Sequence, residues 1–227
     1  KYPLVDRRLQ PVLAILDSDL LDELPPGLIA DTGFDVLTHA VEGFTASNAG
    51  TIPDLLAQDA FRTAFACLPA SYAGDKSVRL RLHMASTLAG IAFSRSGLGL
   101  CHAMAHVLGG RFHIPHGRLN AILLPAVISG NAPAAQAKYA RLARAAGLGG
   151  SADTVALRNL KNGLIRLRKD LGLPQTLSQA GAPPAQVWAA AGEIVEAVLA
   201  DPCCKTNPVP VEDYLVRRVL EEVTGNF

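Results

Sequence analysis

The stretch Asp75-Lys-Ser-Val-Arg-Leu-Arg-Leu-His-Met-Ala-Ser-Thr-Leu-Ala-Gly-Ile-Ala-Phe-Ser94 places apolar side chains three or four residues apart, at Val78, Leu82, Ala85, Leu88 and Ile91. This spacing is the period of an amphipathic α-helix. Gly and Pro separate further segments of the same kind. These are Asp35–Phe44, Pro53–Leu68, Leu100–Gly109, Leu119–Ile128, Ala134–Ala146, Asp153–Leu171, Pro183–Leu199 and Val211–Val223. The predicted fold class is therefore all-α, with many helices.

One segment near the start departs from the helical pattern. Pro11-Val-Leu-Ala-Ile-Leu-Asp17 is a short aliphatic run bounded by Pro and Asp, which predicts a buried strand. A lone strand cannot satisfy its own backbone, so we expect this leading strand to belong to a sheet that the chain does not contain. The chain also begins at Lys1 without an initiator Met or a signal-peptide pattern. We therefore expect it to be part of a longer protein.

Composition narrows the class of protein. Of 227 residues, 49% are hydrophobic and 18% charged, which provides material for a core and argues against disorder. The formal net charge is +1 and aromatic residues make up 5%, so a nucleic-acid partner is not expected. The apolar runs are shorter than the roughly 20 residues of a membrane span, so no membrane association is expected. Four cysteines without a CxxC pair are typical of reduced thiols in a cytoplasmic protein.

Histidines and a carboxylate recur at helical spacing. Asp35 and His39 are four residues apart, as are His102 and His106, so each pair shares one helix face. His116 lies between Pro and Gly. Apolar neighbours surround all three segments, and burying such polar groups without partners is costly. A divalent cation bound by Asp35, His39 and two of the later histidines would resolve this, and such donors suit Fe²⁺ or Zn²⁺.

Other interpretations of these residues stay open on spacing alone. A histidine on an apolar helix face is often a hydrogen-bonded core residue and not a ligand. His83 and His113 are not expected to be ligands, and His102–His106 lacks the Glu of an HExxH zinc site. The chain contains no P-loop and no Gly-x-Ser-x-Gly nucleophile motif.

Several motifs together resemble one enzyme family. They are Asp31-Thr-Gly-Phe-Asp-Val-Leu-Thr-His-Ala-Val-Glu-Gly43, Leu88-Ala-Gly-Ile-Ala-Phe-Ser94, Gly97-Leu-Gly-Leu-Cys-His-Ala-Met-Ala-His106, Ile114-Pro-His-Gly117, Asn120-Ala-Ile-Leu-Leu-Pro125 and Thr206-Asn-Pro208. The chain resembles the helical C-terminal portion of the iron-containing (group III) alcohol dehydrogenases, which have a dehydroquinate synthase-like fold. Lys1-Tyr-Pro-Leu4 and Leu108-Gly-Gly110 are similar to the propanol and ethanol dehydrogenases of bacterial microcompartments.

The resemblance implies a role for each matching residue. It implies that His106 relays a proton, that Lys1 contacts the dinucleotide, and that Phe93 and Cys203 line the substrate pocket. It implies four metal ligands, Asp35, His39, His102 and His116.

The resemblance also implies a domain organisation and an activity. Residues 1–27 would be a remnant of an N-terminal dinucleotide-binding α/β domain, and residues 28–227 the helical metal-binding domain. The expected cofactors are Fe²⁺ (or Zn²⁺) and NAD(P), and the expected reaction interconverts a short primary alcohol and its aldehyde. The expected partners are this small molecule, the missing N-terminal domain and, in the full-length protein, further copies in a homo-oligomer. The expected location is the cytoplasm or a bacterial microcompartment.

Two alternatives belong to other functional classes. The chain alone would be a metal-binding helical domain without catalysis, because most of the dinucleotide site is missing. A dehydroquinate synthase-like lyase would instead need a phosphate-binding Lys/Arg cluster at the metal site, and no Lys flanks the histidine motifs.

Overall fold

The computed structural model describes residues 6–225, and these residues form helices and no strand. The nine α-helices of this described part are α1 (Pro26–Thr45), α2 (Thr51–Tyr72), α3 (Arg79–Ser96), α4 (Leu100–Phe112), α5 (His116–Ala145), α6 (Asp153–Asp170), α7 (Pro184–Ala189), α8 (Ala191–Ala200) and α9 (Asp213–Thr224). Four 3₁₀ turns join them, η1 (Arg7–Leu9), η2 (Asp19–Leu21), η3 (Lys76–Val78) and η4 (Pro202–Thr206). The prediction of an all-α fold is confirmed.

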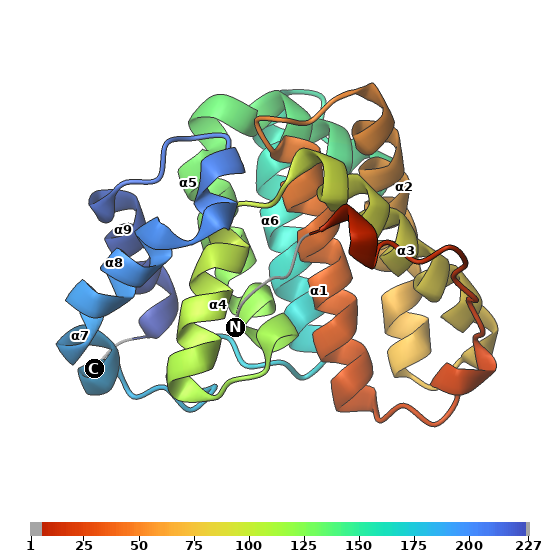
Figure 1. Cartoon of the computed structure of the whole chain (residues 1–227), viewed down its shortest axis with the longest axis horizontal. Helices are drawn as coiled ribbons and strands as arrows, with labels where there is room; N and C mark the ends of the chain where they lie inside the picture. The colour runs from red at the N-terminus through yellow and green to blue at the C-terminus, as the bar shows by residue number, and fades with distance from the viewer. Residues whose placement is uncertain (1–5, 226–227) are drawn as a thin grey trace.

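Helices α1 and α5 occupy the centre of the bundle. Helix α1 packs against α2, α3 and α5, while α5 also packs against α4, α6 and α9. Figure 1 shows α2 and α3 on one side of this pair and α7, α8 and α9 on the other. From Ile29 to Thr45 only Thr32 of α1 is fully exposed, because the helix is apolar on nearly every face and is enclosed by its neighbours.

The N-terminal ends of α1 and α5 approach closely. A Cβ atom on Gly117 would collide with the backbone carbonyl of Asp31, so only glycine allows the first turn of α5 to lie against α1. This contact places His116, the first residue of α5, beside the polar face of α1 that carries Asp35.

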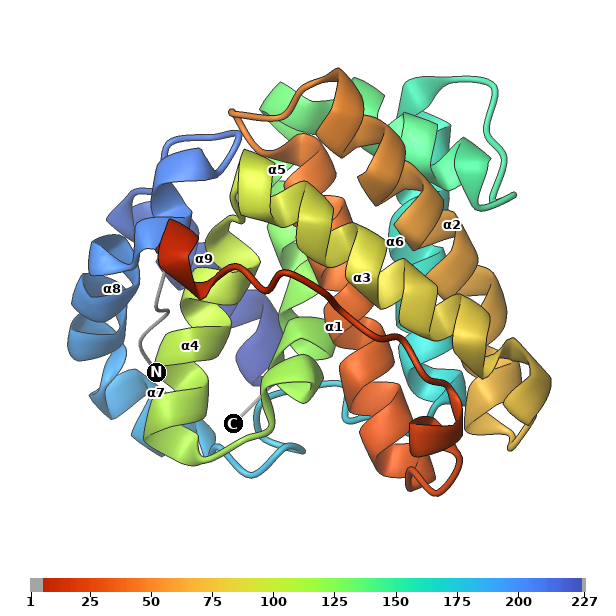
Figure 2. The same ribbon diagram turned by 45° about the vertical axis from the view of Figure 1, so that its right-hand side comes forward.

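The prediction of a strand over Pro11–Asp17 is wrong for this structure. The segment runs without regular structure over α1 and α3 (Figure 2), and the side chains of Val12, Leu13 and Ile15 are exposed. A strand requires backbone hydrogen bonds to a neighbour, and no partner strand exists among residues 6–225. The following turn is held by Arg79, whose Nη1 donates to the carbonyl of Leu21 at 2.6 Å.

The helix boundaries differ from the predicted ones in two places. The two predicted helices Leu119–Ile128 and Ala134–Ala146 form one helix, α5, with Pro125 and Pro133 inside it. The single predicted helix Pro183–Leu199 divides at Ala190 into α7 and α8.

Helix α5 continues through Pro125 because α6 supplies the missing hydrogen bond. Pro125 has no N–H, so the carbonyl of Ala121 loses its helical donor. The buried guanidinium of Arg168 replaces it, with Nη1 donating to Ala121 O at 3.0 Å and to Ile122 O at 3.1 Å. The passage of the helix through Pro125 is therefore stabilised by a tertiary contact and not by the sequence of α5 itself.

Replacing this arginine should destabilise the domain. We expect Arg168→Met to lower the free energy of unfolding by about 3 kcal/mol, because it removes two charge-assisted bonds and leaves a buried carbonyl unsatisfied. Urea denaturation followed by circular dichroism measures this change. Arg166→Met on the exposed face of α6 is the control and should change stability by less than about 0.5 kcal/mol. Equal effects of the two substitutions would contradict the role given to Arg168.

Of residues 6–225, none belongs to a helix long and apolar enough to cross a membrane.

Candidate metal centre

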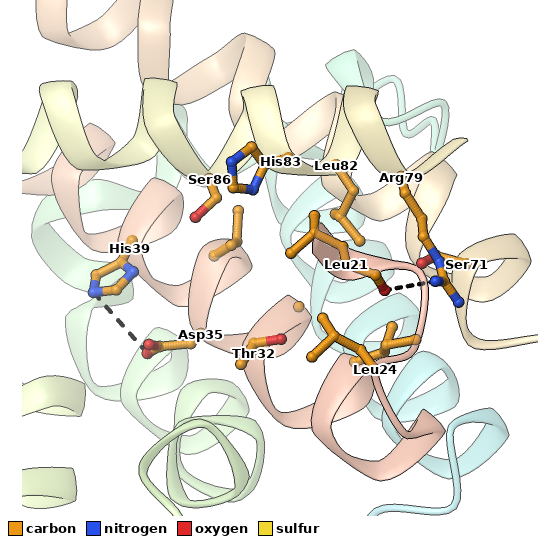
Figure 3. A pocket seen from close by; sticks show the side chains of 13 residues that line it. Leu21, Leu24, Thr32, Asp35, His39, Ser71, Arg79, Leu82, His83 and Ser86 are labelled. Carbon is orange, nitrogen blue, oxygen red and sulfur yellow. Dashed lines mark hydrogen bonds and ion pairs between the residues drawn. The ribbon is translucent and has the colours of Figure 1, made fainter. Parts of the chain in front are cut away.

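Three helices bring the predicted ligand residues together. Helix α1 carries Asp35 and His39 one turn apart, α4 carries His102 in its first turn, and α5 begins with His116. Asp35 Oδ1 lies 3.5 Å from the Nε2 atoms of both His102 and His116, and 4.0 Å from His39 Nε2. Figure 3 shows Asp35 and His39 facing each other from α1.

These distances fit a single cation. In a tetrahedral site with bonds of 2.0–2.1 Å, ligand atoms lie about 3.4 Å apart. Asp35 Oδ1 lies 3.5–4.0 Å from one nitrogen of each histidine, and the ligand atoms of Asp35, His39 and His102 all lie within 4.8 Å of one another. His116 adjoins this group of three through its contact with Asp35. Mixed oxygen and nitrogen donors suit Fe²⁺ and Zn²⁺. We call Asp35, His39, His102 and His116 the ligand cluster.

Glu42 orients one member of the ligand cluster. Its carboxylate accepts the backbone N–H groups of Gly99 (3.0 Å), Cys101 (2.7 Å) and His102 (3.3 Å), and so neutralises the donors at the N-terminus of α4. It lies 2.6 Å from His102 Nδ1. Because a carboxylate only accepts, Nδ1 of His102 carries a proton, and Nε2 faces Asp35.

Asn120, on α5, lies among the ligand atoms. Its Nδ2 donates to Asp35 Oδ1 at 2.6 Å and lies 3.5 Å and 3.3 Å from the Nε2 atoms of His102 and His116. The buried thiol of Cys101 lies 3.6 Å from Asn120 Oδ1, which fixes the orientation of the amide. The amide donor thus partly satisfies an acceptor-rich site that a cation would satisfy more completely.

The electrostatics of the ligand cluster favour positive charge. Burial alone would raise the pKa of Asp35, but a hydrogen bond from His102 and the nearby histidines hold it well below its usual value. Burial alone would lower the pKa of His102, but hydrogen bonds with Asp35 and Glu42 raise it to about 9. Without metal, His102 therefore keeps a proton at the place where a divalent cation would bring two positive charges.

His106 lies one turn after His102 and outside the ligand cluster. Its ring stacks on His116, with centroids 5.2 Å apart, and its Nδ1 lies 2.9 Å from Asp201 Oδ2. Ligand atoms of His106, Asp201 and Cys203 all lie within 4.8 Å of one another. Burial, and then Asp201, raises the pKa of the Cys203 thiol, so the sulfur stays protonated in the chain without metal.

The other predicted site residues lie around the ligand cluster or outside the described residues. Phe93 of α3 stacks on His39 with ring centroids 4.5 Å apart, and Cys203 lies on η4 near His106. Lys1, predicted to contact the dinucleotide, lies outside residues 6–225.

An apolar cavity of about 320 Å³ opens between α1, α3 and η2. Asp35 and His39 line one end, and Leu21, Leu24 and Leu82 line the other (Figure 3). His83 is also part of its wall and is half-buried. His113 is exposed and ends α4 in a left-handed conformation, with φ of 54°.

Three polar residues of the site were missed as such by the sequence analysis: Glu42, Asn120 and Asp201. Glu42 had a usable signal, because a carboxylate three residues after His39 on a helix of apolar residues must find a buried partner. The other two depend on contacts over 85 and 95 residues of sequence, which no local spacing indicates.

Comparison with known proteins identifies the family to which this chain is similar. The sequence model of the Fe-containing alcohol dehydrogenase family, C-terminal, matches residues 29–224. The chain is 42% identical to the 1-propanol dehydrogenase PduQ of Salmonella typhimurium in an alignment of 229 positions that covers 98% of this chain and 62% of that protein. It is 38% identical to the NADPH-dependent butanol dehydrogenase of Clostridium saccharobutylicum, covering 97% of this chain and 57% of that one.

A solved structure agrees with these matches. The iron-containing alcohol dehydrogenase from Thermococcus thioreducens superposes with a TM-score of 0.88 at 33% identity, covering 96% of this chain and 56% of that one. The helical fold is thus that of a C-terminal dehydrogenase domain. The chain belongs to the Fe-containing alcohol dehydrogenase family, and it spans about three fifths of the length of these curated relatives.

Metal affinity of the chain should rise with pH. Because the pKa of His102 is raised to about 9, a cation that binds its Nε2 at neutral pH must displace a proton. We expect the apparent Zn²⁺ affinity to rise about tenfold between pH 7 and pH 8, measured by competition with a chromophoric chelator. An ordinary histidine, with a pKa near 6.5, would give little change in this range.

The matched variant for this measurement is Glu42→Gln. It keeps the size of the side chain and one oxygen that can accept the backbone N–H of Cys101, but removes one negative charge from His102. The pKa of His102 should fall, and the affinity change between pH 7 and pH 8 should shrink. Equal Zn²⁺ affinity of the unaltered chain at the two pH values would contradict this electrostatic interpretation.

Proposed function

We propose that this chain is the metal-binding domain of an NAD(P)-linked alcohol dehydrogenase that interconverts a short primary alcohol and its aldehyde. One observation carries the proposal: Asp35 Oδ1 faces the Nε2 atoms of three histidines at 3.5–4.0 Å, from three different helices. Membership of the family supports it. So do the relatives, named as dehydrogenases of 1-propanol and butanol.

The ligand cluster would hold Fe²⁺ or Zn²⁺, with no other side chain required. When bound, the metal would supply Lewis-acid polarisation of the substrate oxygen, and NAD(P) would supply the exchange of the hydride. The chain itself would orient its histidines through Glu42, shield the cluster from water with Phe93, and accept the alcohol proton at His106. Cys203 would contribute to the substrate pocket on the side of His106, and Lys1 would contact the dinucleotide.

Two alternatives are weighed by specific observations. A lyase of related architecture needs free cations near the metal, but Arg118, on α5 beside His116, is paired with Asp31 at 3.0 Å. A role in metal binding without catalysis would apply to the chain on its own, because the sequence contains no glycine-rich phosphate loop. We propose that catalysis requires the dinucleotide-binding domain of which residues 1–27 would be a remnant, with residues 28–227 as the metal-binding domain.

The rest of the proposal follows from the family resemblance. We propose a homo-oligomeric full-length protein in the cytoplasm or a bacterial microcompartment, acting on a small alcohol or aldehyde.

Metal content tests the ligand cluster directly. We expect the chain to bind about one equivalent of Fe²⁺ or Zn²⁺, measured by mass spectrometry of metals after gel filtration. His102→Gln should reduce metal content at least tenfold, because it removes a buried ligand while Glu42 still holds the backbone of α4. His83→Gln, outside the ligand cluster, is the matched control and should retain the metal.

Activity tests the reaction. The protein that carries this chain should oxidise NADH or NADPH stoichiometrically with propanal, and His102→Gln should abolish this activity. Retention of metal and rate by His102→Gln would refute the ligand assignment. Turnover of a substrate without consumption of NAD(P)H would favour the lyase.

A further inference from the structure

A second carboxylate–histidine pair lies beside the ligand cluster. His106 Nδ1 and Asp201 Oδ2 are 2.9 Å apart, and their side chains are only 15% and 11% exposed. The two residues are 95 positions apart in sequence and come from α4 and the start of η4. Such a short, shielded contact restricts rotation of the imidazole ring.

Asp201 is itself held in place. Its Oδ1 accepts the backbone N–H of Cys203 at 2.8 Å, which makes it the N-terminal cap of η4. Thr206, at the end of η4, donates to the carbonyl of Leu98 at 2.6 Å, and Asn207 Oδ1 accepts the backbone N–H of Leu100 at 3.1 Å. The segment that carries Asp201 is therefore fastened to the start of α4, the helix that carries His106.

The carboxylate of Asp201 remains charged in this environment. Burial alone would raise its pKa, but hydrogen bonds with His106 and Cys203 lower it below the ordinary value. A charged carboxylate can only accept a hydrogen bond, so the neutral imidazole must carry its single proton on Nδ1.

The opposite edge of the His106 ring then presents a lone pair. His106 lines a cavity of about 250 Å³ together with His116, Gly109 and Gly110. Gly110 places no side chain there, and a Cβ on it would meet no atom within 4 Å. A small molecule in this cavity would lie against both His106 and a member of the ligand cluster.

We propose that Asp201 is a positioning residue that fixes the Nδ1–H tautomer of His106, so that Nε2 accepts the proton of the alcohol. For the alcohol to become the aldehyde, its O–H bond would break with the proton passing to Nε2. Its C–H bond would break with the hydride taken up by NAD(P)⁺ where that cofactor is bound, and the carbonyl C=O would form. The inference rests on the proposed function for the reaction, but the tautomer is a property of the chain alone.

Nuclear magnetic resonance tests the tautomer without any turnover. The chain is labelled with ¹⁵N-histidine and loaded with Zn²⁺, which is diamagnetic. The ring signals of His106 are assigned because they disappear in the His106→Gln variant. At pH 8, we expect Nδ1 to be protonated and Nε2 to be bare. Asp201→Ala should produce a mixture of tautomers or the Nε2–H form. Glu196→Gln, on the exposed face of α8, is the control and should leave the spectrum unchanged.

Three outcomes of this experiment would overturn the inference. They are an Nε2–H form in the unaltered chain, a doubly protonated ring at pH 8, or an Nδ1–H form that survives Asp201→Ala.

Kinetics of the protein that carries this chain test the consequence. Asp201→Asn keeps an oxygen to cap Cys203 but loses the charge, and we expect kcat to fall about 10–100-fold with little change in KM for the aldehyde. The double variant Asp201→Asn/His106→Gln should be no slower than His106→Gln alone, because both residues act through one proton transfer. Additive losses would overturn the inference.

The two proposals fail separately. Loss of the Nδ1–H tautomer in Asp201→Ala, in a protein without NAD(P)H-dependent activity, would refute the proposed function and leave the role of Asp201 in the tautomer intact. Full activity with unchanged kcat in Asp201→Asn would refute the role of Asp201 and leave the proposed function intact.

Discussion

The buried carboxylate of Glu42 is the contact on which the candidate site depends. It comes from α1, accepts three N–H groups at the start of α4 and contacts His102 Nδ1. These donors would otherwise be unsatisfied at a helix N-terminus enclosed in the core, and the carboxylate would be an uncompensated charge. The carboxylate satisfies these N–H donors, and the donors compensate its buried charge. Because Glu42 and Asp35 lie two turns apart on one helix, the position of α4 and the direction of His102 are set by the same element that carries the carboxylate ligand.

Glycines allow the remaining elements to reach this contact. At Gly99 a Cβ would lie 2.8 Å from Glu42 Oε1 and 2.7 Å from Asn207 Oδ1, so a side chain there would displace the carboxylate or the loop after η4. At Gly117 a Cβ would collide with the backbone of α1, which would move His116 away from Asp35. The motifs Gly97–His106 and Ile114–Gly117 thus combine ligands with the glycines that let those ligands approach.

The sequence predicted the helices, and it singled out three histidines that the fold brings within 4.0 Å of Asp35, for a physical reason. Periodic apolar residues and i, i+4 pairs are local, so Asp35 with His39 and the helix at His102 could be recognised without a fold. Contacts between distant segments could not be recognised in this way. Arg168 donates a hydrogen bond to the carbonyl that Pro125 leaves without its helical donor, so one helix forms where two were predicted. The aliphatic run at Pro11–Asp17 has strand composition, but composition cannot supply the partner strand that a ladder needs.

Helix α4 then carries two histidines one turn apart, each paired through Nδ1 with a carboxylate from a different direction. Glu42 reaches His102 from α1 at 2.6 Å, deep in the core, whereas Asp201 reaches His106 from η4 at 2.9 Å, near a cavity. Both histidines contact a carboxylate through Nδ1, but their surroundings differ and suit them to different roles. Facing Asp35 and His116, the Nε2 of His102 is suited to bind a cation. Beside a cavity large enough for a small molecule, the Nε2 of His106 is suited to accept a proton. One helix face thus holds a candidate ligand and a candidate base at a fixed separation of one turn.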